Sequence, residues 1–142
     1  MIRCLLPIIL LMLSGCQESE LITIHVGEVS ADVELAATGE RRRQGLMHRK
    51  SLDRDRGMLM VFPQAKQQKM WMLNMQIPLD VGFFDDDGVL LNIVTMEPDG
   101  GKTIHRSIAP ALYALEMNRG WYARNGIEPG VGLYLPRVIE GR

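Results

Sequence analysis

A cysteine near the N-terminus carries the clearest chemistry in this sequence. It closes the run Leu13-Ser14-Gly15-Cys16, in which an aliphatic residue, a small residue and a glycine precede the thiol, and this order resembles a lipobox. In a lipobox the cysteine thiol becomes acylated, and the small neighbours let the signal peptidase approach the backbone. We therefore expect Cys16 to be a lipid-attachment site and the first residue of the mature protein.

The segment before Cys16 has the composition of a secretory signal. Arg3 gives a short positive region, and Leu5 to Leu13 is a nine-residue apolar run. A membrane-spanning helix needs roughly twenty apolar residues, so this run fits a cleaved signal better than a transmembrane segment. The sequence predicts a lipoprotein signal peptide over residues 1–15 and a short tether over residues 16–20. An ordinary signal peptide cleaved at another small residue is the alternative.

Acylation of Cys16 would make the lipid bilayer the first partner of the protein. One acyl chain gives only marginal binding, and the resemblance to bacterial lipoproteins implies three chains. The second mature residue would be Gln17 and not aspartate, which in the sorting pattern of such lipoproteins implies the outer membrane. We therefore expect a location in the cell envelope, facing the periplasm. Cys4 would leave with the signal, so no disulfide could form.

Methionines supply the second chemistry-bearing group. Met70, Met72 and Met75 stand close together in the sequence, and thioether ligands select Cu(I). Packing is the competing interpretation, because methionine fills irregular cores well. A calcium loop at Asp85-Asp86-Asp87 is not expected, since Met96 occupies the twelfth position, where a bidentate glutamate is needed. We expect no cofactor, and a Cu(I) site on the three methionines is the alternative.

Sequence motifs of common hydrolases and of nucleic-acid-binding proteins are missing. No serine stands in a nucleophile elbow, no His-Glu-x-x-His occurs, and the mature chain would keep no cysteine as a nucleophile. Without Arg3 the chain has 15 basic and 17 acidic residues, a formal charge of −2, so nucleic acid is not an expected partner. The basic cluster Arg41-Arg42-Arg43 is typical of a solvated helix face.

The elements that must position these residues are short, and most are strands. Alternating apolar and polar side chains predict a half-buried strand over residues 29–35, and Asp87-Gly88 between two apolar runs predicts a hairpin. Most connections are too short for a helical crossover. We expect a mostly β (β-rich α+β) fold, a compact single-domain β-barrel or sandwich over residues 21–142. The expected strands are 21–26, 29–35, 57–62 (stopped by Pro63), 81–84, 89–94, 111–117 and 131–135, about seven in all, with two short helices over 40–47 and 119–124.

The order of short motifs resembles one known family. Gly45-Leu46-Met47, Gly57-Met58-Leu59, Trp71-Met72, Pro78-Leu79-Asp80 and Leu115-Glu116 follow one another along the chain. This order is similar to that of the bacterial and archaeal family known as domain of unknown function 192, over about residues 22–135. The resemblance implies a small, mostly β domain that is often exported, and it implies no established activity.

Five positions that match the family motifs carry groups able to bind a ligand. A tryptophan platform, an amide, a guanidinium and two carboxylates suit a small polar ligand or a saccharide. These candidate pocket residues are Arg49, Trp71, Asn74, Asp80 and Glu116. The competing interpretation is structural, with Trp71 in the core, Asp80 at a strand end or paired with Arg49, and Glu116 bonded to backbone donors.

The sequence therefore predicts an envelope lipoprotein that binds rather than catalyses. The first hypothesis is a non-catalytic binding module for a small polar ligand, a saccharide or a partner protein. A periplasmic hydrolase-type enzyme using Asp80 and Glu116 is the second, and it requires the two carboxylates to face each other. A Cu(I)-handling protein using Met70, Met72 and Met75 is the third.

Overall fold

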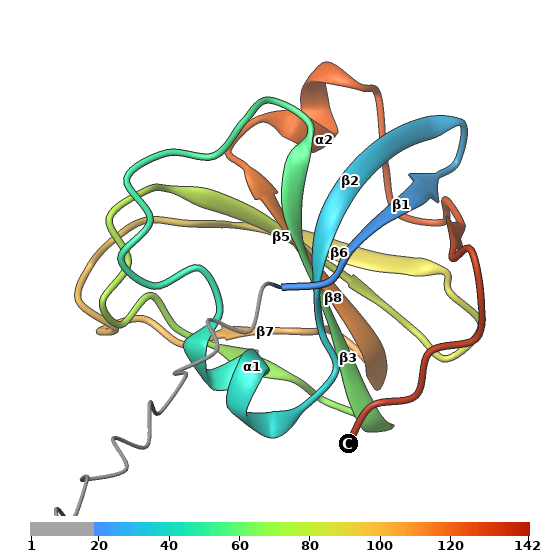
Figure 1. Cartoon of the computed structure of the whole chain (residues 1–142), viewed down its shortest axis with the longest axis horizontal. Coiled ribbons are helices and arrows are strands. Elements are labelled where there is room, and N and C mark those ends of the chain that lie inside the picture. Colours follow the sequence, from blue (N-terminus) through green and yellow to red (C-terminus); the bar gives the residue numbers. More distant parts are fainter. Residues whose placement is uncertain (1–18) are drawn as a thin grey trace, which may run out of the picture.

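The computed structural model describes residues 19–142, so the predicted signal peptide and Cys16 lie outside the described residues. The expected mostly β fold is confirmed, as a curled seven-stranded sheet with a two-stranded ribbon and two short helices (Figure 1). In the part of the chain that the structure describes, no helix has the length and apolarity needed to cross a membrane. The elements are β1 (Leu21–Val26), β2 (Val29–Ala36), α1 (Gly39–Gln44), β3 (Arg56–Lys66), β4 (Lys69–Met70), β5 (Leu79–Phe84), β6 (Leu90–Met96), β7 (His105–Arg106), β8 (Ala111–Asn118), α2 (Trp121–Arg124) and β9 (Leu133–Tyr134).

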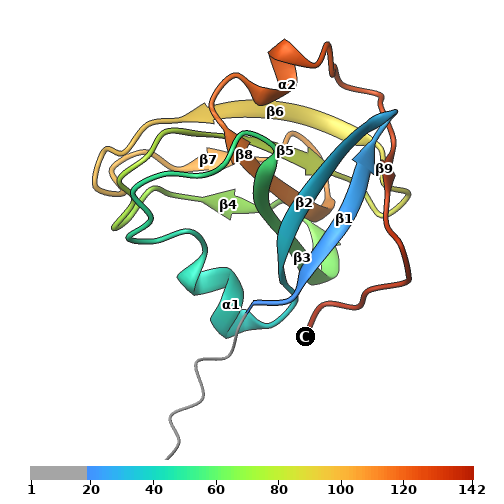
Figure 2. The ribbon, with the colours of Figure 1, turned by 45° about the horizontal axis from the view of Figure 1, so that its top comes forward.

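The seven-stranded sheet runs in the order β6-β5-β8-β3-β2-β1-β9 and curls into a half-barrel (Figure 2). Its neighbouring strands are antiparallel except β2 and β3, which are parallel and are connected through α1. The two ends of the sheet are joined by backbone hydrogen bonds. Leu90 donates its N–H to the carbonyl of Val131 at 2.9 Å, and Leu133 donates to the carbonyl of Gly88 at 2.7 Å. These bonds satisfy polar groups that an open sheet edge would leave exposed.

Turn residues explain two hairpins of the sheet. β1 and β2 meet at Gly27, whose φ of +59° glycine adopts without strain. The Asp-Gly hairpin expected between β5 and β6 is confirmed. There the Oδ1 atom of Asp85 accepts backbone N–H bonds from Asp87 and Val89 at 3.0 and 2.8 Å, which holds the turn closed.

Helix α1 and strand β3 differ most from their predicted ends, each for an identifiable reason. Helix α1 stops at Gln44 rather than at residue 47, because Gly45 leaves the helical conformation with a φ of +50°. Strand β3 does not stop at Pro63 but continues to Lys66. The pairing of β3 with β8 is irregular between Val61 and Lys66, so the missing N–H of the proline interrupts no regular ladder.

The ribbon of β4 and β7 was not predicted from the sequence. It pairs Lys69 with Arg106 and Met70 with His105 in antiparallel register. A two-way contact extends it, since Ser107 donates its N–H to the carbonyl of Gln68, and Gln68 donates its N–H to Ser107 Oγ. Strands of two residues are too short to show alternation, which is why the pattern of the sequence does not reveal them.

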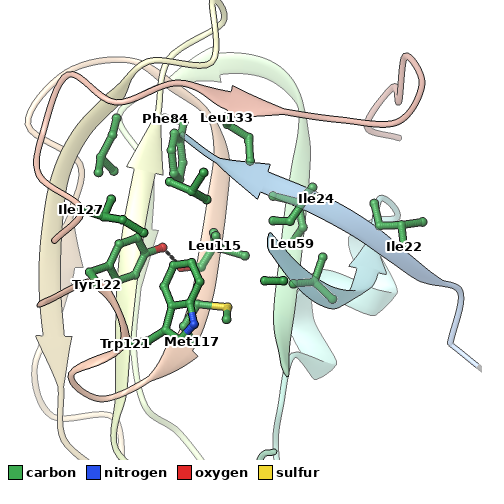
Figure 3. Packing of buried hydrophobic residues seen from close by; sticks show 14 of the residues in the cluster. Ile22, Ile24, Leu59, Phe84, Leu115, Met117, Trp121, Tyr122, Ile127 and Leu133 are labelled. Atoms are coloured by element: carbon green, nitrogen blue, oxygen red, sulfur yellow. Dashed lines mark hydrogen bonds between the residues drawn. The ribbon is translucent and has the colours of Figure 1, made fainter. Parts of the chain in front are cut away.

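Apolar side chains pack on both faces of the sheet and form two clusters. The first cluster lies within the curl and includes Ile24, Leu59, Leu115 and Trp121 (Figure 3). The second cluster lies on the opposite face and is rich in methionine. Its members include Leu46, Met58, Met60, Met70, Met72, Phe83 and Met96. Burying one such side chain contributes roughly 1.5–3 kcal/mol, so both clusters stabilise the sheet.

A tyrosine locks the first cluster to the central strands. The hydroxyl of Tyr122 donates to the carbonyl of Leu115 at 2.7 Å and accepts the N–H of Gly82 at 3.1 Å (Figure 3). The ring reaches these atoms only because Gly82 has no side chain. A Cβ atom at that position would lie 2.5 Å from the Tyr122 hydroxyl oxygen.

Candidate functional site

A cavity of about 540 Å³ lies between α1, the second half of β3, β4 and the loop that follows β4. Small-molecule sites commonly have volumes of roughly 300–1,000 Å³. The walls are mostly apolar and come from the methionine-rich cluster and its surroundings. They include Leu46, Met60, Phe62, Met70, Trp71 and Met75.

One acidic side chain, Glu116 of β8, lines this cavity. The residue is only 5% exposed, and its Oε2 atom is buried without a hydrogen-bond partner among the described residues. Leaving a buried polar atom unpaired costs roughly 1–3 kcal/mol, which is why native structures usually pair such atoms. Glu116 is therefore an exception that calls for an explanation.

The register of β8 puts Glu116 on the cavity side of the sheet. Alternate side chains of a strand point to opposite faces. Leu115 and Met117 belong to the cluster within the curl, so Glu116 between them points to the other face. Its cross-strand partners are Met58 on β3 and Val81 on β5, both fully buried and apolar. The carboxyl group is thus flanked by apolar side chains of both neighbouring strands.

This apolar environment changes the acidity of the group. Burial raises the pKa of Glu116 from 4.5 to about 7. No ion pair with a basic side chain is formed within residues 19–142 to offset the desolvation. Near neutral pH the side chain is present in both protonation states, so it can donate through its O–H or accept through its carboxylate.

Basic side chains surround the mouth of the cavity. Arg42, Arg43, Lys66 and Lys69 all contribute to its lining. The guanidinium of Arg42 is fixed by main-chain carbonyls, with 2.9 Å to Ala37 and 2.7 Å to Val61, and it lies 5.5 Å from the ring centre of Phe62. The other three side chains are on exposed residues. The site therefore combines an apolar interior, one buried carboxyl group and a positive mouth.

Two of the five candidate pocket residues lie at this cavity. Trp71 is 54% exposed and lines it together with Glu116, so Trp71 is not a core residue. Asp80 lies on the opposite face of β5 from Val81, the cross-strand neighbour of Glu116. Its Oδ1 accepts from the hydroxyl of Thr95 and its Oδ2 from the N–H of Gly120, both at 2.7 Å. Asp80 holds the turn before α2 and does not face Glu116.

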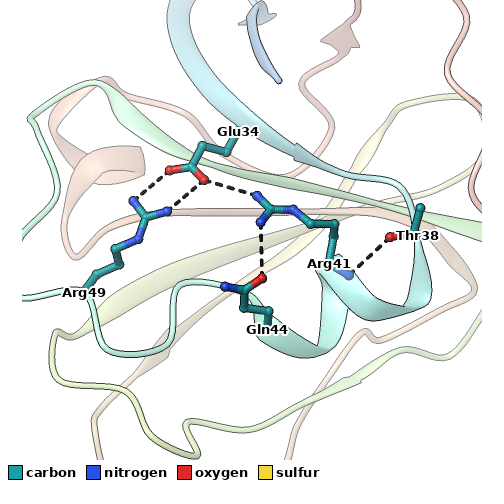
Figure 4. Close-up of polar contacts among 5 residues, drawn as sticks. All are labelled: Glu34, Thr38, Arg41, Gln44 and Arg49. Carbon is teal, nitrogen blue, oxygen red and sulfur yellow. Dashed lines mark hydrogen bonds and ion pairs between the residues drawn. The ribbon is translucent and has the colours of Figure 1, made fainter. Parts of the chain in front are cut away.

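Arg49 takes part in an ion-pair network with Glu34 and Arg41 (Figure 4). It is not among the residues that line the cavity. Its two terminal nitrogens contact both carboxylate oxygens of Glu34, at 2.8 and 2.9 Å. Arg41 of α1 contacts the same carboxylate at 3.4 Å and donates to Gln44 at 3.2 Å. Burial acts to raise the pKa of Glu34, but the hydrogen bonds and charges of these arginines outweigh it and leave the pKa below its usual value. The network fixes α1, which forms one wall of the cavity.

Asn74 contributes to the backbone around the site. Its carbonyl accepts the N–H of His48 at 3.1 Å, and both residues have positive φ values, +57° and +65°. Asparagine adopts this conformation more readily than most residues. The side chain of Asn74 is not among those that line the cavity.

The three methionines of the Cu(I) hypothesis occupy different places. Met70 and Met75 line the cavity, whereas Met72 is 1% exposed inside the methionine-rich cluster and does not line it. Among residues 19–142, no group of three His, Cys, Asp or Glu side chains is arranged to hold a metal ion. Met70 and Met72 belong to the methionine-rich cluster, and Met75 packs against it.

Sequence reasoning missed the basic mouth and the role of α1. The cluster Arg41-Arg42-Arg43 is evident in the sequence, but in the structure each of its three side chains has a different environment. Arg41 pairs with Glu34, Arg42 binds main-chain carbonyls and Arg43 lines the cavity. Lys66 and Lys69 reach the mouth through an extension of β3 and through the ribbon, neither of which the sequence pattern revealed.

One family model and two solved structures are similar to this chain. The model of family DUF192, described as an uncharacterized ACR, matches residues 22–134. A crystal structure from Sinorhizobium meliloti 1021, described as a "putative transcription regulator", is 32% identical with a TM-score of 0.77, covering 82% of this chain and 95% of its own. A protein of unknown function from Novosphingobium aromaticivorans DSM 12444 is 30% identical with a TM-score of 0.77, covering 84% and 88%. A search of functionally curated proteins finds no match.

Proposed function

This chain belongs to the DUF192 family, and we propose that it is a non-catalytic binding module that holds a small ligand in the cavity over Glu116. The observation that carries the proposal is the buried carboxyl group of Glu116, a residue that lines a mostly apolar cavity of about 540 Å³ and whose Oε2 atom has no hydrogen-bond partner among the described residues. A polar group of a ligand would hydrogen-bond to this carboxyl group. Its apolar body would replace water against the methionine and leucine side chains.

The surroundings of Glu116 favour binding over hydrolysis. General acid–base catalysis by carboxylates needs a second group near the first, with a separated pKa. Asp80 is engaged by Thr95 and Gly120 on the other face of the sheet, and among the described residues the cavity has no second acidic side chain. Glu116 alone can orient a ligand through one hydrogen bond. We therefore assign it a binding role.

The neutral dye N-phenyl-1-naphthylamine is a suitable first probe, because its fluorescence rises in apolar sites. We expect the protein to bind it at one site. Met75→Trp should fill part of the cavity and weaken binding by at least about tenfold. Leu21→Trp, which adds the same side chain at an exposed position of β1, is the matched control and should bind like the wild type. Unchanged binding to a folded Met75→Trp variant would contradict the proposal.

We also propose that the module works in the cell envelope, tethered by acylated Cys16 and facing the periplasm from the outer membrane. The support is the order Leu13-Ser14-Gly15-Cys16 behind a short apolar run, together with Gln17. Labelling of growing cells with radioactive palmitate tests this. The wild-type protein should be labelled and sediment with outer membranes, and Cys16→Ala should be unlabelled. A wild-type protein that stays unlabelled and soluble would overturn the assignment.

A further inference from the structure

We propose that the ligand of the cavity is an amphipathic anion, with its negative group held at the mouth by Arg43, Lys66 and Lys69. The inference rests on the proposed binding function and adds the chemical class of the ligand. The proposed ligand is a small molecule with an apolar or aromatic body and a carboxylate, sulfate or phosphate group.

The mouth has an excess of positive charge. Four basic residues line the cavity, and the one acidic residue in its lining is Glu116, which is buried. The ion pairs formed within residues 19–142 involve Arg41, Arg49, Arg119 and Arg137, and none of the four cavity cations. Among the described residues, no aspartate or glutamate side chain forms an ion pair with any of these four cations.

Helix α1 shows that this imbalance is local. On one side of the helix, Arg41 is neutralised by Glu34, which also binds Arg49 (Figure 4). On the cavity side, Arg42 is bound by main-chain oxygens of Ala37, Val61 and Arg142. Within residues 19–142, Arg43 forms no ion pair with an aspartate or glutamate. Burial, followed by the neighbouring charge of Arg43, lowers the pKa of Arg42, as expected where positive charges lie close together. The fold thus neutralises one side of α1 and leaves the other side positive.

The ribbon adds a second unfavourable contact between like charges. Lys69 on β4 stands directly opposite Arg106 on β7, and both residues are exposed. Like charges at directly opposed positions of two strands destabilise the pair. An anionic group bound beside Lys69 would relieve this repulsion. Trp71, two residues after Lys69 in the sequence, is exposed and also lines the cavity.

The depth of the cavity explains why the ligand should be amphipathic rather than a simple inorganic anion. A small anion at the mouth would leave the apolar walls and the Oε2 atom of Glu116 without a partner. An anion deep in the cavity would lie beside Glu116, which repels it whenever that group is ionised. A molecule with its charge at the mouth, an apolar body against Met60 and Met75, and a hydrogen-bonding group at Glu116 matches all three zones.

Two dyes with one apolar body test the charge requirement directly. The anion 8-anilino-1-naphthalenesulfonate is N-phenyl-1-naphthylamine with an added sulfonate. We expect the wild-type protein to bind the sulfonate at least about tenfold more tightly at low salt, because opposite charges at contact contribute on the order of a few kcal/mol near a protein surface. This advantage should shrink between about 50 and 500 mM sodium chloride, while binding of the neutral dye should not weaken.

Variants at the mouth show whether the cavity is responsible. Lys66→Gln combined with Lys69→Gln should weaken binding of the sulfonate by about tenfold and change binding of the neutral dye by less than about twofold. The matched control is Lys50→Gln with Lys102→Gln, which removes two exposed lysines that do not line the cavity. It should leave both dyes bound as by the wild type.

The two proposals fail in different ways. Equal affinity of the wild type for the two dyes, or an equal loss of sulfonate binding in the control pair, would overturn the anionic ligand and leave the binding module standing. No binding of either dye would overturn both. Met75→Trp should weaken both dyes together, because it removes space rather than charge.

Discussion

Replacing Glu116 by glutamine should change how the stability of the protein depends on pH. In the folded protein, burial raises the pKa of Glu116 from 4.5 to about 7. A pKa difference between folded and unfolded states is worth 1.36 kcal/mol per pKa unit, so this shift corresponds to roughly 3 kcal/mol. Glutamine keeps the shape of the side chain and never ionises. It therefore represents the protonated glutamate at every pH.

The sign follows from which state binds the proton. Between pH 4.5 and about 7 the folded protein keeps the proton on Glu116 while the unfolded chain has lost it. Stability falls with rising pH wherever the folded state binds more protons. The loss of stability caused by ionising the buried Glu116 is absent below pH 4.5, grows across this interval and is complete above about pH 7. Relative to Glu116→Gln, the wild type should thus lose roughly 3 kcal/mol between pH 4 and pH 8.

Urea unfolding of both proteins at several pH values between 4 and 8.5 measures this difference. Glu128→Gln is the matched control, because it makes the same substitution at an exposed glutamate. It should keep the pH dependence of the wild type. A wild type and a Glu116→Gln variant whose free energies of unfolding differ by the same amount at every pH would refute the buried, unpaired carboxyl group.

Three further predictions concern contacts that hold the fold together. Asp80→Asn should destabilise the protein by about 1–3 kcal/mol in urea unfolding, because an amide cannot accept from both Thr95 and Gly120; full stability would mean that these bonds are dispensable. Gly82→Ala should lower the free energy of unfolding by more than about 2 kcal/mol, since the new Cβ meets the hydroxyl of Tyr122. Adding Tyr122→Phe, which removes that hydroxyl, should recover part of this loss. A double-mutant cycle on the ion pair between Glu34 and Arg49, using Glu34→Gln and Arg49→Gln, should give a coupling free energy of about 1 kcal/mol that decreases as salt is added. Zero coupling at low salt would contradict the bidentate pair.

Local sequence patterns predicted most of the secondary structure elements. The alternation in β2, the Asp-Gly hairpin and the apolar run of β3 are short-range features, and each predicted its element. The features that the sequence did not predict depend on pairing between residues that are distant in the sequence. The ribbon joins Lys69 to Arg106, and the extension of β3 beyond Pro63 depends on where its pairing with β8 becomes irregular.

The site was only partly predictable for the same physical reason. Trp71 and Glu116 could be named from motifs, but motifs do not tell which face of the sheet a side chain takes. One residue of register separates Asp80 from Val81, and this places Asp80 and Glu116 on opposite faces. The positive mouth needs α1, β3 and β4 to meet, so its cations looked like ordinary surface charges in the sequence.

The carboxyl carbon resonance of Glu116, followed by ¹³C NMR, tests the central claim most directly. Saturation with N-phenyl-1-naphthylamine should move this resonance and shift its titration midpoint from about 7, because a ligand in the cavity changes the solvation and hydrogen bonding of the group. The carboxyl resonance of Glu128 should stay where it is. A bound dye that leaves the resonance and midpoint of Glu116 unchanged would contradict a ligand site over this residue.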